Sequence, residues 1–217
     1  PARNIRAIPS DGLYRVRVDL LREEIARDRE AGLTPFFISG NAGTTNTGAV
    51  DDLSALADLA RDEGLWLHVD GAYGGFFMMT ERGRRAMDGI ERADSITLDP
   101  HKGLFLPYGT GSLLVRDAQT LRRTHSHHAH YLPPMQEEEA FVDFCEISPE
   151  LSRGFRGLRV WLPFKMHGAE TFRRCLDEKI DLALWAAGEL SGIDGIEILA
   201  EPQLSLVAFR LAPAGAD

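Results

Sequence analysis

Residues 65–71 are Leu65-Trp66-Leu67-His68-Val69-Asp70-Gly71, a mostly apolar run that ends in a carboxylate and a glycine. A second such run, Ser95-Ile96-Thr97-Leu98, is followed a few residues later by Lys102. Short apolar runs bounded by turn-forming residues predict buried β-strands. In an open parallel sheet, the carboxyl ends of the strands face the ligand crevice. We therefore expect Asp70 and Lys102 to point into one site.

An acid and an amine that converge in this way suit pyridoxal phosphate. The amine forms a Schiff base with the cofactor, and the acid pairs with the protonated pyridine nitrogen that makes the ring an electron sink. Each residue alone has a simpler explanation, because Asp70 could be a turn former and Lys102 a solvated or phosphate-contacting surface residue. Nearby glycines favour the ligand site, since they let the backbone turn tightly and approach a planar ligand. They are Gly71, Gly74, Gly75 and Gly103.

Helical and strand-like patterns alternate along the first part of the chain, which predicts an α/β fold with a mostly parallel sheet. We expect Asp19 to cap the first helix and Gly32 to end it. The expected helices cover residues 19–31, 51–63 and 80–91, and the expected strands cover residues 36–39, 65–69, 95–98 and 111–115.

The second part of the chain has a different pattern. Residues 116–150 are polar and predict a long irregular segment, of the kind that forms a lid or a linker. A helical pattern follows from Phe155 to about Leu190, with a kink expected at Pro163. Residues 196–199 and 204–210 predict two strands of a small second domain.

These patterns divide the chain into three expected parts. Residues 1–150 form the C-terminal part of a large cofactor-binding domain, including a mobile loop at 116–150. Residues 151–190 form a connecting helix, and residues 191–217 begin a small C-terminal domain.

Composition narrows the possible partners. The chain has 33 acidic and 24 basic residues and a net charge of −9, with the charges interspersed. Nucleic-acid binding needs clustered lysine and arginine, so we expect none. Two cysteines, no apolar signal segment at residues 1–4 and no membrane-length apolar stretch predict a cytoplasmic protein without a membrane partner.

A histidine-rich run, His125-Ser126-His127-His128-Ala129-His130, could in principle bind a metal ion. It has no cysteine or acidic cluster at a recognised ligand spacing, so we expect no metal site there.

Several motifs together resemble one known family, the group II pyridoxal-phosphate-dependent amino-acid decarboxylases, which include the aromatic L-amino-acid decarboxylases. The resemblance extends over essentially all 217 residues. It rests on Ala7-Ile8-Pro9-Ser10-Asp11-Gly12, Gly43-Thr44-Thr45, Trp66-Leu67-His68-Val69-Asp70, Ala93-Asp94-Ser95, Pro100-His101-Lys102 and Phe155-Arg156-Gly157-Leu158-Arg159.

The resemblance implies a fold-type I pyridoxal-phosphate-dependent transferase fold and a homodimer with shared active sites. Family members are considerably longer than this chain. We therefore expect the chain to begin inside the large domain, to end inside the small one and to need a missing N-terminal half as its partner.

The resemblance also implies roles for single residues. Lys102 would carry the Schiff base, Asp70 would pair with the pyridinium, and the methyl group of Ala72 would pack on one face of the ring. Thr45 would line the cofactor site, although its hydroxyl could instead satisfy the loop backbone. His101 would contact the phosphate or the substrate carboxylate.

Asp99 departs from the family pattern, because animal aromatic decarboxylases have an asparagine that helps to hold the phosphate at this position. A carboxylate would repel a phosphate dianion. We expect Asp99 to turn towards backbone amides or neighbouring hydroxyls instead.

Tyr131 lies 29 residues after Lys102, the offset at which these decarboxylases carry the tyrosine of their mobile catalytic loop. That tyrosine gives a proton to the substrate carbon after carbon dioxide leaves, and relatives with phenylalanine there tend to be aldehyde synthases. Tyr131 could alternatively be an aromatic anchor under a loop.

The expected function is pyridoxal-phosphate-dependent α-decarboxylation of an L-amino acid, with an aromatic substrate favoured. Two alternatives remain. One is another fold-type I enzyme, namely an aldehyde synthase, an aminotransferase or a carbon–carbon lyase. The other is an inert fragment that needs its missing half.

Overall fold

The computed structural model describes residues 4–126 and 142–212 of the chain. Its main sheet has four strands in the order β1-β2-β3-β4. The first three strands are parallel to one another, and β4 is antiparallel to β3. This arrangement confirms the predicted mostly parallel sheet. The strands are β1 (Phe37–Asn41), β2 (Trp66–Asp70), β3 (Ser95–Leu98) and β4 (Ser112–Val115).

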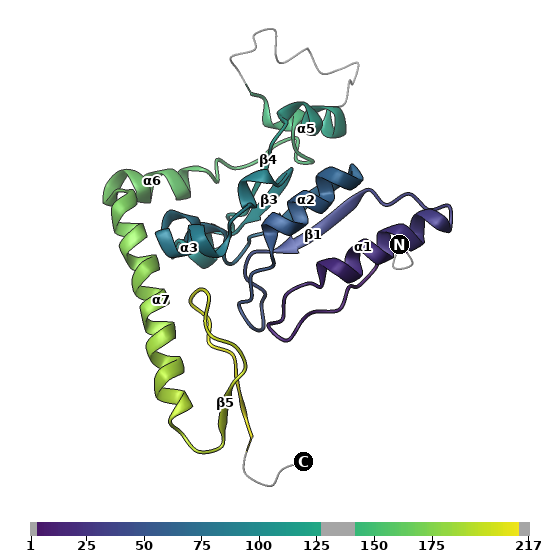
Figure 1. Cartoon of the computed structure of the whole chain (residues 1–217). Helices are drawn as coiled ribbons and strands as arrows, with labels where there is room; N and C mark the ends of the chain where they lie inside the picture. Colours follow the sequence, from purple (N-terminus) through teal and green to yellow (C-terminus); the bar gives the residue numbers. More distant parts are fainter. Residues whose placement is uncertain (1–3, 127–141, 213–217) are drawn as a thin grey trace.

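Helix α2 (Leu53–Glu63) covers one face of this sheet, as Figure 1 shows. Asp52 caps the helix by accepting a hydrogen bond from the backbone N–H of Ala55 at 2.9 Å. Gly64 ends it in the left-handed conformation, with φ at 66°. The apolar side of the helix is buried against the sheet. The fully buried residues of this contact are Leu53, Leu56, Leu59, Leu67 and Val69.

Side chains alternate between the two faces of each strand. Ile38, Leu67 and Val69 lie on the face that α2 covers and are buried. The opposite face carries the other residues of β1 and β2, and Phe37 is 48% exposed there. His68 and Asp70 belong to this more open face, which determines the surroundings of the candidate site.

Helix α1 (Val18–Glu30) begins at an N-cap residue, Arg17, whose side chain makes no capping hydrogen bond. The prediction that Asp19 caps this helix was wrong. Asp19 lies inside the first turn and accepts a hydrogen bond from Nε of Arg17 at 2.8 Å. This side-chain hydrogen bond lowers the pKa of Asp19 to about 2.

The helix predicted at residues 80–91 is divided in two. Thr80 caps α3 (Glu81–Ala86), and Gly89 has a φ of 92°, which breaks the helix before the short 3₁₀ turn η3 (Ile90–Arg92). Only glycine adopts this conformation without strain. Another 3₁₀ turn, η2 (Gly75–Met79), precedes α3.

The segment predicted to be irregular, residues 116–150, contains structure in its described parts. Helix α5 (Ala118–His125) follows Asp117, whose side chain accepts a hydrogen bond from the N–H of Gln119 at 2.9 Å. A 3₁₀ turn, η4 (Phe144–Glu146), lies near the other end. The aspartate cap and the helix-forming residues after it account for α5.

The long helical pattern after Phe155 forms two helices, α6 (Leu158–His167) and α7 (Ala169–Ser191). The helical pattern breaks at Gly168, five residues after Pro163, where a kink was expected. Gly168 has a φ of 76°, which glycine alone adopts freely, whereas Pro163 stays inside α6. Figure 1 shows α7 running along one side of the molecule.

The C-terminal segment forms a two-stranded antiparallel sheet of β5 (Ile196–Ile198) and β6 (Phe209–Leu211). The strand predicted at residues 204–210 is therefore shorter and begins later. The buried side of α7 consists of Phe172, Leu176, Ile180 and Ala183. Within the described ranges, none of the helices combines the length and apolarity that crossing a membrane requires.

The segment between β5 and β6 reaches the loops that follow the main strands. The hydroxyl of Tyr73 lies 2.9 Å from the Ser205 hydroxyl and accepts a hydrogen bond from the Ser205 N–H at 3.0 Å. Gln203 accepts a hydrogen bond from the N–H of Val50 at 2.9 Å. The C-terminal segment thus packs onto the same side of the molecule as the candidate site.

Candidate functional site

Asp70 is the last residue of β2, and its neighbours in register are Asn41 on β1 and Thr97 on β3. Its side chain accepts a hydrogen bond from the N–H of Ala72 at 3.0 Å. Asp70 is exposed. The carboxylate is therefore held by the backbone at the carboxyl edge of the sheet and remains accessible to a ligand.

Lys102 lies on the short helix α4 (Pro100–Gly103), which directly follows β3. Its side chain is 45% exposed, and its Nζ lies 3.0 Å from the carboxylate of Asp99. The N–H of Asp99 donates a hydrogen bond to the carbonyl of Ala72 at 3.2 Å. This bond connects the turn that carries Lys102 to the turn that follows Asp70.

Asp99 does not turn to backbone amides or hydroxyls as expected; its carboxylate pairs with Lys102. It also lies 3.8 Å from Nε2 of His101, which is too long for a hydrogen bond. Nδ1 of His101 lies 3.2 Å from the carbonyl of Thr110. Because a carbonyl only accepts, Nδ1 donates this bond and fixes the ring. The prediction was wrong because it did not consider the amine one helical turn away.

Thr45 lies exposed in the loop after β1. The hydroxyl that holds this loop together belongs to its neighbour, Thr44, which accepts a hydrogen bond from the N–H of Ala49 at 3.1 Å and lies 2.8 Å from the hydroxyl of Thr47. Ala72 lies directly after Asp70 and is half-buried.

The glycines around the site have a packing role within the protein. A Cβ atom at Gly74 would lie 2.1 Å from the carbonyl oxygen of Ala42, and one at Gly103 would lie 2.9 Å from Cβ of Phe76. A side chain at either position would collide with the chain itself. The expectation that these glycines make room for a ligand is therefore not needed to explain them.

A hydrogen-bonded group that the sequence reasoning missed lies on the same face as Asp70. Nε1 of Trp66 donates to the Ser95 hydroxyl at 2.9 Å, and Nδ1 of His68 lies 2.8 Å from the same hydroxyl. Nε2 of His68 lies 3.2 Å from the hydroxyl of Thr97. The period of two along β2 places residues 66, 68 and 70 on one face and could have indicated this group.

The environment of His68 favours the neutral ring. Partial burial lowers the pKa of His68 from its ordinary value of 6.5, although the carboxylate of Asp70 opposes this shift. The His68 ring also stacks on Phe37, with 5.9 Å between ring centroids. At neutral pH the imidazole is therefore uncharged.

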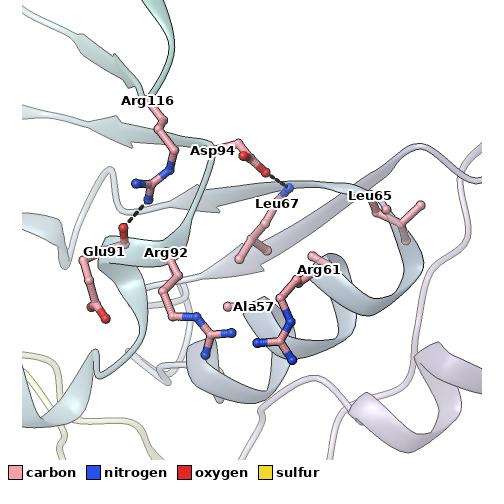
Figure 2. Close-up of a pocket in the computed structure, with 10 residues that line it drawn as sticks. Ala57, Arg61, Leu65, Leu67, Glu91, Arg92, Asp94 and Arg116 are labelled. Atoms are coloured by element: carbon pink, nitrogen blue, oxygen red, sulfur yellow. Dashed lines mark hydrogen bonds between the residues drawn. The ribbon is translucent and has the colours of Figure 1, made fainter.

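A pocket of about 450 Å³ lies at the opposite, amino-terminal edge of β2 and β3 (Figure 2). Its arginines are engaged in internal contacts, since Arg92 pairs with Asp58 at 2.6 Å and Arg116 donates to backbone carbonyls of Glu91 and Ala93. Asp94, also in its wall, accepts from the N–H of Leu67. This pocket is separate from the candidate site.

Tyr131 and most of the histidine-rich run lie outside the described residues. Within residues 4–126 and 142–212, no group of three or more histidine, cysteine or acidic side chains could hold a metal ion.

The pyridoxal-dependent decarboxylase conserved domain matches residues 2–212, so the chain belongs to this family.

Three comparisons support this assignment. The aromatic-L-amino-acid decarboxylase of Bacillus atrophaeus is 43% identical over 208 residues, which are 95% of this chain and 43% of that protein. The phenylacetaldehyde synthase of Arabidopsis thaliana is 34% identical over 213 residues, covering 97% of this chain and 44% of that protein. The crystal structure of Catharanthus roseus tryptophan decarboxylase in complex with L-tryptophan matches with a TM-score of 0.89 and 30% identity, over 100% of this chain and 44% of that chain.

These similarities confirm the predicted fold-type I class. The chain spans less than half the length of the curated relatives it matches. The chemistry of the described edge fits the cofactor of the family. An exposed amine, Lys102, and an exposed carboxylate, Asp70, follow neighbouring parallel strands, with an imidazole, His101, beside the amine.

Proposed function

We propose that this chain forms the pyridoxal-phosphate-binding part of an L-amino-acid α-decarboxylase, with an aromatic amino acid as substrate. The observation that carries the proposal is the position of Asp70, at the carboxyl end of β2, and of Lys102, after the carboxyl end of the neighbouring parallel strand β3. Ligands of open α/β sheets bind at this edge.

When bound, pyridoxal phosphate supplies an aldehyde carbon for amines and a ring that accepts an electron pair from the substrate. Lys102 would hold that carbon through Nζ as a Schiff base, formed with loss of water, until a substrate amine takes its place. The Lys102 amine released by this exchange would then pair with the carboxylate of Asp99, which lies 3.0 Å from it.

Asp70 would pair with the protonated ring nitrogen and stabilise its positive charge. The hydrogen bond from the N–H of Ala72 keeps the carboxylate in place for this contact. The methyl group of Ala72 would pack against one face of the ring. Gly71, which lies between these two residues, is fixed to β3, because its N–H donates to the carbonyl of Thr97 at 3.0 Å.

His101 binds the cofactor phosphate or the substrate carboxylate through Nε2, since its Nδ1 is used by Thr110. Thr45 lines the cofactor site from the loop after β1. Asp99 contributes to the site through Lys102 and not as a phosphate ligand, because its charge opposes that of the phosphate.

Tyr131 donates the proton that replaces the lost carboxylate on the substrate carbon. This role rests on the distance in sequence between Tyr131 and Lys102. With Tyr131 present, the product is the amine and not the aldehyde. In this proposal, the part of the chain that carries Tyr131 helps to exclude water during the reaction.

The complete enzyme is a cytoplasmic homodimer with shared active sites, and the chain works together with an N-terminal half. In this proposal residues 1–150 complete the large domain, residues 151–190 connect the domains and residues 191–217 begin the small one. The Bacillus relative is an aromatic-L-amino-acid decarboxylase and the Catharanthus relative a tryptophan decarboxylase, which supports the choice of an aromatic substrate.

The proposal is tested by a decarboxylation screen over the twenty amino acids and DOPA, in the presence of pyridoxal phosphate. The chain is assayed alone and as part of a full-length protein of the family's usual length. Carbon dioxide and an aromatic amine support the proposal. An aldehyde would favour the synthase alternative, and no carbon dioxide from any substrate would reject the decarboxylase function.

A further inference from the structure

The group formed by Trp66, Ser95, His68 and Thr97 lies on the face of the sheet that carries Asp70. We infer that these side chains form a directed hydrogen-bond chain that orients the carboxylate of Asp70, with His68 as its central positioning residue. The inference rests on the role proposed for Asp70 and adds residues to that site.

The direction of the chain follows from the hydrogen-bonding capacity of its members. The indole nitrogen of Trp66 can only donate, so it occupies a lone pair of the Ser95 hydroxyl, 2.9 Å away. Ser95 is only 6% exposed. Leaving its hydroxyl proton without an acceptor at such a buried position costs free energy, so the proton is donated to Nδ1 of His68 at 2.8 Å.

The tautomer of His68 then determines the next link. Nδ1 accepts from Ser95, so the ring proton is on Nε2 and is donated to the hydroxyl of Thr97 at 3.2 Å. The Thr97 hydroxyl keeps its own proton for donation. Thr97 is the partner of Asp70 in the parallel register, so both side chains leave the sheet on the same face.

The charge state of His68 matters as much as its orientation. Burial lowers the pKa of His68, and Asp70 is the charged group that acts against this shift. The His68 ring contacts three uncharged side chains of the neighbouring strands, which are Phe37, Ser95 and Thr97. A neutral His68 leaves the negative charge of Asp70 available for a cationic ring nitrogen, whereas an imidazolium would compete for it.

The first test uses nuclear magnetic resonance on the ¹⁵N,¹³C-labelled chain without cofactor. We expect His68 to be neutral at pH 7.5 with the proton on Nε2, and Ser95→Ala to disturb this tautomer. Thr97→Val, which removes the hydroxyl and keeps the shape, should move the carboxyl-carbon resonance of Asp70. A proton on Nδ1, a charged ring or an unmoved Asp70 resonance would overturn the inference.

Ser39→Ala provides the matched control. Ser39 is the partner of His68 in register on the other neighbouring strand, β1, and it is exposed. Removing its hydroxyl should leave both the His68 tautomer and the Asp70 resonance unchanged. Equal effects of Ser39→Ala and Ser95→Ala would show a general disturbance of the sheet and would contradict a specific chain.

The second test measures the equilibrium affinity of the protein for pyridoxal phosphate. Thr97→Val should weaken binding about three- to tenfold relative to Ser39→Ala, which is the size of one typical net hydrogen bond, because Thr97 acts on the cofactor only through Asp70. Equal affinities would reject the positioning role. If the unmodified protein binds no pyridoxal phosphate, the proposed function fails, while the resonance experiment still decides whether the chain orients Asp70.

Discussion

The amine of Lys102 and the carboxylate of Asp99 lie 3.0 Å apart, one helical turn from each other on either side of His101. The pair combines the residue proposed to hold the cofactor with the residue that departs from the family pattern. Because the carboxylate of Asp99 forms an ion pair with Lys102, its negative charge faces a positive charge at the edge of the site. This explains how a carboxylate is tolerated beside a proposed phosphate site.

Replacing Asp99 by asparagine tests this explanation. Asp99→Asn removes the repulsion of the phosphate and releases Lys102, so pyridoxal phosphate should bind about two- to fivefold more tightly. The free energy of unfolding should change by less than about 1 kcal/mol, because Lys102 is 45% exposed and the pair is screened by solvent. Equilibrium dialysis and urea unfolding measure the two quantities. Exposed Asp88→Asn is the control, and weaker binding by Asp99→Asn alone would contradict this role.

The charge of Asp70 should be needed for cofactor binding. Asp70→Asn keeps the shape of the side chain but loses the charge that faces the ring nitrogen. Pyridoxal phosphate affinity should fall about 10- to 100-fold, as expected for a hydrogen bond between charged groups. Asp62→Asn, at an exposed position on α2, should have no effect on the affinity. A change of less than twofold for Asp70→Asn would exclude Asp70 as the partner of the ring.

Tyr73 should make the free energy of unfolding depend on pH in the alkaline range. Its hydroxyl contacts both the hydroxyl and the N–H of Ser205, so Tyr73→Phe should reduce the free energy of unfolding by about 1–2 kcal/mol at pH 8. Burial raises the pKa of Tyr73 above its ordinary value of 10.0. The folded state then holds the proton more tightly than the unfolded state. The contribution is complete below about pH 10 and is lost as the pH rises through the folded pKa.

Urea unfolding between pH 8 and pH 11 measures this dependence. The stability advantage of the unmodified protein over Tyr73→Phe should shrink above pH 10. Tyr108→Phe, at a position that is 82% exposed, controls for the loss of a tyrosine. A constant difference between the unmodified protein and Tyr73→Phe over the whole range would show that the buried hydroxyl does not titrate differently in the two states.

Much of the fold could be predicted because its signals are local. The apolar runs that end in Asp70 and Leu98 predicted the central parallel strands. The spacing of the leucines in α2 predicted which side of this helix is buried. The position of the helix break could not be predicted in the same way. Pro163 is the stronger sequence signal, but the conformation at Gly168 depends on where the chain must turn, which the local sequence does not contain.

The sequence allowed the location of the site at the carboxyl edge of the sheet to be predicted. It did not allow the side-chain contacts within the site to be predicted. Asp70 and Lys102 follow adjacent strands as expected, because parallel strands share their carboxyl edge. The partner of Asp99 and the contacts of His68 depend on the register between strands, which no single stretch of sequence specifies. Tyr131 lies outside the described residues, so its role remains a prediction.

The central claim is that Lys102 attaches the cofactor. The direct measurement is borohydride reduction of the protein with pyridoxal phosphate, followed by proteolysis and mass spectrometry. We predict a pyridoxyl group on Lys102, its loss in Lys102→Arg and its retention in Lys165→Arg, an exposed control. A pyridoxyl group on a different lysine, or unchanged labelling in Lys102→Arg, would contradict the account.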